Sequence, residues 1–268
     1  MHETTTARRG ARRLRSHLRA VGQVLAGGAA FVGHGTQWGS TDAERAMTMP
    51  GDADGDPSAP VVLRMTRAIS IERPPEVVWP WLAQFGRGAG WYSIDGVDNG
   101  GRTSARHIVS WIPEPRVGDA AGIGYLRRLE PGHALTWFMP PVAFLSARMS
   151  MCIDMHLGET DDGARLVCRV TSAGGGRLAR LATWLFAAID SIMFRKVLLG
   201  VRERAEAHGR RTIDPDLLET GARDQFQLYE TIFAAGERAG VPGREGAAAA
   251  RKAAIAAGVL APAEDPAG

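Results

Sequence analysis

The sequence feature that most constrains the fold is a continuous helical periodicity that runs from Arg177 to His208. At a rise of 1.5 Å per residue, a helix of this extent would reach roughly 45 to 50 Å, enough to cross an entire β-sheet. Its apolar positions form one broad stripe, which must be buried against another element of structure. These positions include Leu178, Leu181, Leu185, Ile189, Ile192 and Val197. We therefore expect a sheet that packs against this helix.

A strand pattern precedes the helix. From Ser146 to Leu157 apolar and polar residues alternate, which is the period of a half-buried strand. One face carries Met149, Met151, Ile153, Met155 and Leu157, and the other carries Ser150, Cys152, Asp154 and His156. The segment Thr160 to Gly163 predicts a hairpin turn, because Asp-Gly readily adopts positive φ, and Arg165 to Thr171 returns as the partner strand. Successive antiparallel strands are the expected result.

The upstream half adds shorter elements. Alternation from Val62 to Ile71 predicts a strand in which Arg67 falls on the apolar side. A helix is expected to begin near Pro75, and Pro80 is expected to kink or split it. A helical turn and two short strands are expected at Ser104–Trp111, Ala120–Leu126 and Ala134–Met139.

These elements predict an α+β fold in which a curved antiparallel sheet wraps around the long helix. We expect a basic, flexible tail over residues 1–37, one domain over 38–210 and a helical extension over 211–268. Turn-forming residues from Thr48 to Pro60 predict a linker. The extension would dock on its own domain or pair with another subunit, so a homo-oligomer is one expectation. Its apolar positions include Phe226, Tyr229, Ile232 and Phe233.

The basic charge belongs to the tail rather than to the domain. Residues 1–19 carry six arginines and one glutamate, a net charge of +5, so the rest of the chain contributes −2 to the total of +3. We therefore expect no nucleic-acid surface on the folded domain. The alternatives for the tail are weak attachment to an anionic membrane surface or to nucleic acid, and a signal or anchor in this segment. Cys152 and Cys168 lie in strand-like segments and are expected to be buried free thiols, which suits a cytoplasmic protein.

Several short motifs resemble one protein superfamily. They are Trp38 to Arg45, Met49 to Asp52, Thr66 to Ile69, Pro74 to Leu82, Gly90 to Ser93 with Asp95, Val117 to Asp119, Met193, Gly200-Val201 and Arg204 to Glu206. Together with the order of elements, they resemble the SRPBCC or START-like helix-grip superfamily, and within it a bacterial subgroup without a settled function. Its members include polyketide cyclases/dehydrases, lipid-transfer domains and plant hormone-binding proteins. The resemblance implies a cavity between sheet and helix and leaves the reaction open.

The expected cavity has candidate lining residues on three elements. The methionine face of the strand supplies Met149, Met151 and Met155, since methionine adapts to varied apolar ligands, although this face would equally form ordinary core. We expect the helix to contribute Ile189 and Met193. The remaining candidates for ligand contact are Trp81, Trp91, Tyr92, Asp95, Trp137 and Arg169. Trp91, Tyr92 and Asp95 are expected at the cavity mouth, whereas the orientation of Arg169 stays open.

Catalytic candidates are weaker. A cyclase or dehydratase needs a positioned base and a donor, and Asp95 with Arg106 or His107 could fill these roles. The alternative is a loop capped by Asx turns, with Arg106 paired to an acid. His156 is expected to be exposed. The histidines and cysteines show no metal-ligand spacing, so neither a metal nor a cofactor is expected.

Binding of a hydrophobic or amphipathic small molecule, such as a lipid, polyketide or isoprenoid, is the leading functional prediction. A cyclase/dehydratase-like enzyme and a regulatory or interaction protein are the alternatives.

Overall fold

We describe the protein from a computed structural model. It describes residues 33–52, 60–99, 101–121, 124–144, 147–174 and 176–207, together with positions 19, 22 and 23, but not the side chains of 140–149, 178 and 179. Our predictions for most of the Arg-rich tail, for residues 53–59 of the linker and for the helical extension over 211–268 lie outside the described residues.

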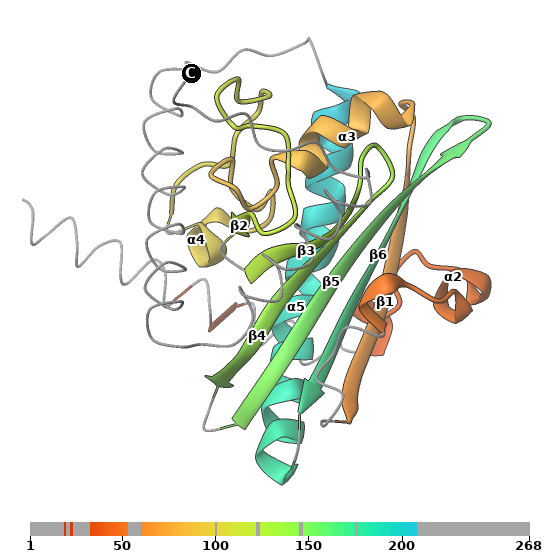
Figure 1. The fold of residues 1–268 in the computed structure, drawn as a ribbon. Coiled ribbons are helices and arrows are strands. Elements are labelled where there is room, and N and C mark those ends of the chain that lie inside the picture. Colours follow the sequence, from red (N-terminus) through yellow and green to blue (C-terminus); the bar gives the residue numbers. More distant parts are fainter. Residues whose placement is uncertain are drawn as a thin grey trace, which may run out of the picture.

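The fold is α+β, with a six-stranded antiparallel sheet and one long helix. The strands lie in the order β1-β6-β5-β4-β3-β2. They are β1 Val61–Ile71, β2 Ala120–Ala121, β3 Gly124–Glu130, β4 Ala134–Phe144, β5 Ala147–Thr160 and β6 Gly163–Gly174. Figure 1 shows that the sheet is curved and that the helix lies across one face of it. This confirms the predicted fold class and is compatible with a helix-grip fold.

The β5–β6 hairpin is the one that the alternation predicts. Thr160 pairs with Gly163, so Asp161 and Asp162 form the turn. Gly163, the first residue after the turn, has a φ of 141°, whereas neither Asp161 nor Asp162 has a positive φ. The conformational freedom of glycine is therefore used after the turn and not within it.

The long helix α5 spans Gly176–Glu206, within two residues of the predicted ends. It contacts β1, β5, β6 and the short helix α3. Ala187, Phe194, Val197 and Val201 lie in the main core beneath it. One predicted core position is wrong, because Leu181 is 55% exposed. Figure 1 shows that the first turns of α5 extend beyond the ends of the strands.

The methionine face of β5 is confirmed as a core face where its side chains are described. Met151, Ile153, Met155 and Leu157 all belong to the main hydrophobic core. The side chain of Met149 lies outside the description, although its backbone pairs with Gly174.

The opposite face of the sheet is also buried, which the alternation does not predict. Residues 33–52 lie over it and include the helix α2 Asp42–Ala46 and the 3₁₀ helix η1 Pro50–Asp52. Asp154 accepts a hydrogen bond from the Gly51 backbone N–H at 3.0 Å and from the Thr136 hydroxyl at 2.7 Å. Ser150 and Cys152 are buried on the same face, and His156 is exposed as expected.

The connections before β2 differ in detail from the prediction. The helix α3 Pro75–Ala83 begins at the predicted residue but continues through Pro80, where only the hydrogen bond to the Glu76 carbonyl is lost. A short helix, α4 Asp95–Asp98, follows.

The predicted helical turn at Ser104–Trp111 is absent. Tertiary partners occupy the backbone groups that such a turn would use. The Ala105 N–H donates to the Ala89 carbonyl, and the Val109 N–H donates to the Gln84 side chain at 2.9 Å.

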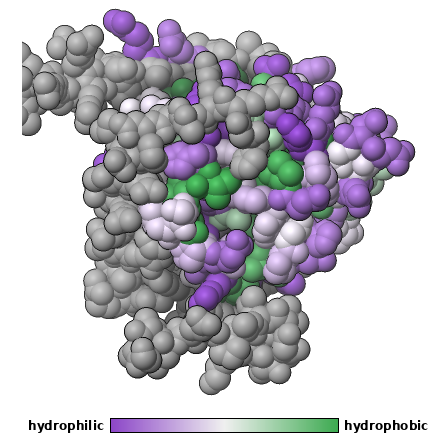
Figure 2. All heavy atoms as spheres, turned by 90° about the horizontal axis from the view of Figure 1, so that it is seen from above, coloured by the Kyte–Doolittle hydropathy of each residue, from purple (hydrophilic) through white to green (hydrophobic). Residues whose placement is uncertain are grey.

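Figure 2 shows the molecule from above. On the face seen in this view, hydrophobic residues lie among hydrophilic ones.

Candidate functional site

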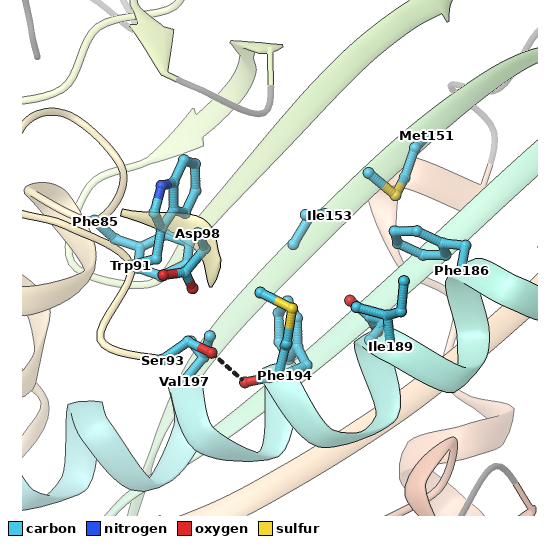
Figure 3. A pocket seen from close by; sticks show the side chains of 12 residues that line it. Phe85, Trp91, Ser93, Asp98, Met151, Ile153, Phe186, Ile189, Phe194 and Val197 are labelled. Carbon is cyan, nitrogen blue, oxygen red and sulfur yellow. Dashed lines mark hydrogen bonds between the residues drawn. The ribbon is translucent and has the colours of Figure 1, made fainter. Parts of the chain in front are cut away.

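A cavity of about 290 Å³ lies between α5, β5 and the loop that follows α3. Most of its lining is apolar, and Figure 3 shows the side chains that converge on it. The lining residues are Phe85, Trp91, Ser93, Asp98, Met151, Ile153, Phe186, Ile189, Asp190, Met193, Phe194 and Val197. Apolar walls with a few polar groups are typical of sites for small molecules.

The helix supplies one side of the cavity. The first lining position on α5 is Phe186, and the others follow it by three, four, seven, eight and eleven residues, ending at Val197. Residues with this spacing share one face of a helix. The opposite side comes from β5, where Met151 and Ile153 are alternate residues and point to the same face of the sheet.

The loop after α3 closes one end of the cavity with two aromatic rings. Phe85 and Trp91 pack edge to face, with ring centroids 5.1 Å apart and an interplanar angle of 89°. Gly86 lies between them in the chain with a φ of 68°, and a Cβ at this position would come within 2.5 Å of the Trp91 ring. Glycine at position 86 is therefore required for this packing.

Trp91 and Tyr92 are neighbours in sequence but contact different parts of the molecule. Tyr92 has a φ of 56°, a left-handed conformation that tyrosine rarely adopts. Its hydroxyl accepts a hydrogen bond from the Gln84 amide at 2.8 Å, and the Arg204 guanidinium lies 4.4 Å from its ring centroid. Burial raises the pKa of Tyr92 above its ordinary value. Trp91 lines the cavity, whereas Tyr92 holds the loop against the end of α3, through Gln84, and against α5, through Arg204.

Asp98 brings a carboxyl group to the apolar cavity from the end of α4. Its Oδ1 atom is buried and has no hydrogen-bond partner among the described residues. Burial, together with the like charge of Asp95, raises the pKa of Asp98 from 3.8 to about 7. In Figure 3 the carboxyl group points into the space between the loop and α5.

Asp190 is the second acidic residue of the cavity, and it is paired. Its Oδ2 atom lies 2.8 Å from Nη1 of Arg67, a residue of β1 whose side chain is fully buried. Arg67 also donates from Nε to the Gly35 carbonyl at 2.5 Å and lies 5.4 Å from the Phe194 ring centroid. Burial raises the pKa of Asp190, and the charge of Arg67 opposes this shift.

Four of the predicted ligand-binding residues line the cavity, namely Trp91, Met151, Ile189 and Met193. Three others, Trp81, Trp137 and Met155, are buried in the main core and are not among the lining residues. The side chain of Met149 lies outside the description. Core and cavity lining share one face of the sheet, so alternation alone does not separate them.

Asp95 does not line the cavity. It accepts hydrogen bonds from the Ser104 backbone N–H at 3.1 Å and from the Ser104 hydroxyl at 2.5 Å. Its position therefore matches the structural alternative, in which an aspartate stabilises the loop.

Arg169 lies on the opposite face of the sheet, so its prediction as a ligand contact is corrected. It donates to the backbone carbonyls of Glu44, Arg45 and Met47, and it forms an ion pair with Asp52 at 2.6 Å. The residues over β6 thus surround it completely, and alternation could not reveal them because they lie more than 100 positions away in sequence.

The remaining catalytic candidates also lie away from the cavity. Arg106 forms an ion pair with Glu203 at 2.7 Å, and both side chains are partly exposed. The backbone carbonyl of His107 accepts a hydrogen bond from Gln84, and its half-buried ring is not among the lining residues.

Sequence reasoning missed some lining residues that a signal could have revealed. Phe186, Phe194 and Val197 follow from Ile189 by helical spacing, so the complete stripe was available. Asp190 and Arg67 each place a charge on an apolar face, and opposite charges of this kind are expected to pair when they are buried. Phe85, Ser93 and Asp98 come from loop geometry and had no periodic signal.

The described residues contain neither a membrane-spanning helix nor a group of metal ligands. None of the helices they form is long and apolar enough to cross a membrane. No group of three or more histidine, cysteine, aspartate or glutamate side chains in this part of the chain could hold a metal ion. Cys152 and Cys168 are both buried, and neither belongs to a disulfide.

Comparison with known proteins leaves the family open. No protein-family model matches the chain, and no curated protein matches it. The crystal structure of protein MLL2253 from Mesorhizobium loti is similar with a TM-score of 0.36 and 15% sequence identity, over 55% of this chain and 98% of that chain. Membership of the SRPBCC superfamily therefore stays a prediction.

Proposed function

We propose that this protein binds a hydrophobic or amphipathic small molecule in the cavity between α5 and the sheet. The observation that carries the proposal is the cavity itself, about 290 Å³ in volume and lined by four aromatic rings and five aliphatic or methionine side chains. Its volume is close to the lower end of the range for small-molecule sites. Membership of the SRPBCC superfamily, where such cavities are expected, is part of the same proposal.

The cavity volume limits the size of the ligand. A cavity of about 150 Å³ holds one benzene molecule, so 290 Å³ has room for an apolar body about twice that size. This favours a compact isoprenoid, a polyketide fragment or a single short chain over a lipid with two long chains. Met151 and Met193 on opposite walls can adjust to related shapes, because methionine has three rotatable side-chain bonds.

Binding is a better-supported proposal than catalysis. The cyclase or dehydratase alternative relied on Asp95, Arg106 and His107, and none of the three lines the cavity. The alternative of an interaction protein relies on residues after 211, which lie outside the described residues.

The remaining parts of the proposal concern location and partners. Two buried free thiols suit the reducing environment of the cytoplasm. Contact of the Arg-rich tail with anionic lipid and pairing of the C-terminal segment between subunits stay proposals that rest on the sequence alone.

A neutral fluorescent probe of suitable size, N-phenyl-1-naphthylamine, tests the binding proposal. We expect saturable binding with one probe per chain, and native mass spectrometry of freshly purified protein should detect an apolar molecule that co-purifies. Ile189→Trp would fill the cavity and should weaken probe binding about tenfold or more, equivalent to about 1.4 kcal/mol.

Leu181→Trp is the matched control, since it makes the same kind of change at an exposed position of the same helix. Circular dichroism would establish that both variants are folded. Absence of saturable binding to the wild type, or equal weakening by both variants, would contradict the proposal.

A further inference from the structure

We infer that the ligand carries a hydrogen-bond-donating head, a hydroxyl or ammonium group, and that Asp98 accepts its hydrogen bond inside the cavity. This inference rests on the proposed function and specifies the chemical class of the ligand. It excludes carboxylates and other anionic amphiphiles as preferred ligands.

The first step is that the described residues contribute three polar side chains to the cavity lining, Ser93, Asp98 and Asp190. Ser93 donates its hydroxyl proton to the Met193 carbonyl at 3.0 Å, as the dashed line in Figure 3 shows. Asp190 forms an ion pair with Arg67, with 2.8 Å between Oδ2 and Nη1. The Asp98 carboxyl also interacts with the Ser93 hydroxyl, and its Oδ1 atom is the buried acceptor of this set that has neither a hydrogen bond nor an ion pair within the described part of the chain.

The second step concerns the unsatisfied oxygen of Asp98. Its Oδ1 atom is buried and lacks a hydrogen-bond partner among the described residues. A buried acceptor without a donor costs about 1–3 kcal/mol, whereas a ligand hydroxyl or ammonium group would supply the missing donor. Asp98 lines the cavity beside Trp91, and a rotation of its carboxyl group would present the enclosed Oδ1 atom to a molecule that fills the apolar space.

The third step is the sign of the charge. Among the described residues the cavity lining contains no lysine or arginine, and Arg67, which reaches the lining residue Asp190, is paired with it. Asp95 adds a further negative charge close to Asp98, which helps to raise the pKa of the Asp98 carboxyl. A carboxylate or phosphate head would meet like charge without a compensating cation. A hydroxyl head suits Asp98 in both protonation states, because each state retains an accepting oxygen.

Probes of similar size with different polar heads distinguish the contribution of the head to affinity from that of the apolar body. We would measure how 1-decanol, its isomer methyl nonyl ether and decanoate displace N-phenyl-1-naphthylamine from the wild-type chain at pH 8. The alcohol has a donor, the ether has none, and decanoate is an anion. We expect the alcohol to bind about five- to tenfold more tightly than the ether, with decanoate the weakest of the three.

Two variants assign the preference to Asp98. Asp98→Leu removes the acceptor, so alcohol and ether should bind within about twofold of each other. Asp98→Asn retains a carbonyl acceptor without the charge, so it should keep the preference for the alcohol and improve decanoate binding. Asp161→Asn, an exposed change in the β5–β6 turn, should leave all three affinities at wild-type values.

The outcomes distinguish this inference from the proposed function. Equal affinities for alcohol and ether in the wild type, or tightest binding of decanoate, would overturn the donor assignment and leave a purely apolar cavity. An alcohol preference that persists in Asp98→Leu would overturn the role of Asp98. If no probe binds to the wild type, the proposed function fails and the inference fails with it. Asp98→Asn, which is nearly isosteric, provides the test if Asp98→Leu does not fold.

Discussion

Nη1 of Arg67 on β1 and Oδ2 of Asp190 on α5 lie 2.8 Å apart and join the sheet to the long helix beside the cavity. The two residues are 123 positions apart in the sequence, and each places a charge on an otherwise apolar face. Arg67 also reaches the Gly35 carbonyl, so this side chain connects the helix to the segment on the N-terminal side of β1.

Removal of one partner from this ion pair should be costly. Asp190→Ala leaves the buried Arg67 charge without its counter-charge, so we expect the free energy of unfolding to fall by about 3–5 kcal/mol. The double variant Arg67→Met with Asp190→Leu should recover much of this loss, because it leaves no unpaired charge. Urea denaturation measures both. Asp42→Ala is the control, since Asp42 pairs with Arg45 at the exposed surface and its loss should cost less than about 1 kcal/mol. Similar losses for Asp190→Ala and Asp42→Ala would show that the buried pair has no special role.

Arg169 should matter for the N-terminal covering segment and not for ligand binding. Arg169→Leu removes the hydrogen bonds that hold residues 44–47 and the ion pair to Asp52. We expect a loss of about 2–4 kcal/mol in stability and faster amide hydrogen exchange over residues 42–52. Affinity for N-phenyl-1-naphthylamine should stay within about twofold of the wild type, because Arg169 lies on the other face of the sheet. Weaker probe binding without faster exchange would restore Arg169 as a ligand contact.

The stability of the protein should depend on pH through Asp98. The pKa of this carboxyl is about 7 in the folded chain against an ordinary value of 3.8, so between these values the folded chain holds a proton that the unfolded chain has lost. Stability must therefore decrease as the pH rises through this window, by at most about 4 kcal/mol from this one group.

Asp98→Asn removes this contribution, so the variant should gain stability relative to the wild type as the pH rises from 5 to 8. Asp154 and Asp190 also have raised pKa values, but they change the stability of the wild type and of Asp98→Asn by the same amount. Thermal unfolding at matched pH values measures the difference. Asp161→Asn should show no such trend, and a constant difference for Asp98→Asn would contradict the raised pKa.

Gly86 should be intolerant of a side chain for two separable reasons. Gly86→Ala strains a backbone with a φ of 68° and also brings a Cβ within 2.5 Å of Trp91. Gly132→Ala strains a backbone with a φ of 81° but meets no neighbour within 4 Å, so it isolates the backbone effect. We expect the free energy of unfolding to fall by about 1 kcal/mol in Gly132→Ala and by about 2–4 kcal/mol in Gly86→Ala. Tryptophan fluorescence should change in Gly86→Ala alone. Equal losses would mean that the Trp91 ring can move aside.

Much of the fold could be predicted because it depends on local periodicity. The alternation of Met151, Ile153, Met155 and Leu157 identified the core face of β5, and the helical period identified α5 to within two residues of its ends. Pro75 marked the start of α3 for an equally local reason, since proline suits the first turn of a helix.

The cavity could be predicted only in part. Ile189, Met193 and Met151 were predicted because they lie on periodic elements. Asp98 lies at the end of the short helix α4, whose position depends on the preceding loop with Gly86 and with Tyr92 in a left-handed conformation next to Arg204. Loop paths of this kind have no period in the sequence. Trp137 and Met155 show the converse limit, since they share the correct face but pack in the core beyond the cavity.

The sequence by itself thus determined β1, β5, β6, the long helix and the face of the sheet that the helix covers, because these depend on the spacing of apolar residues along the chain. The one strand expected over Ala120–Leu126 is instead the hairpin of β2 and β3. Only the tertiary structure decided that the other face is buried as well, and that Arg169 and Asp154 are structural residues. Those of their partners that belong to residues 44–52 lie more than 100 positions away, and Asp154 also accepts a hydrogen bond from Thr136 on the neighbouring strand. Hydrogen bonds between such distant groups depend on how the segments meet in space, and no local pattern encodes that meeting.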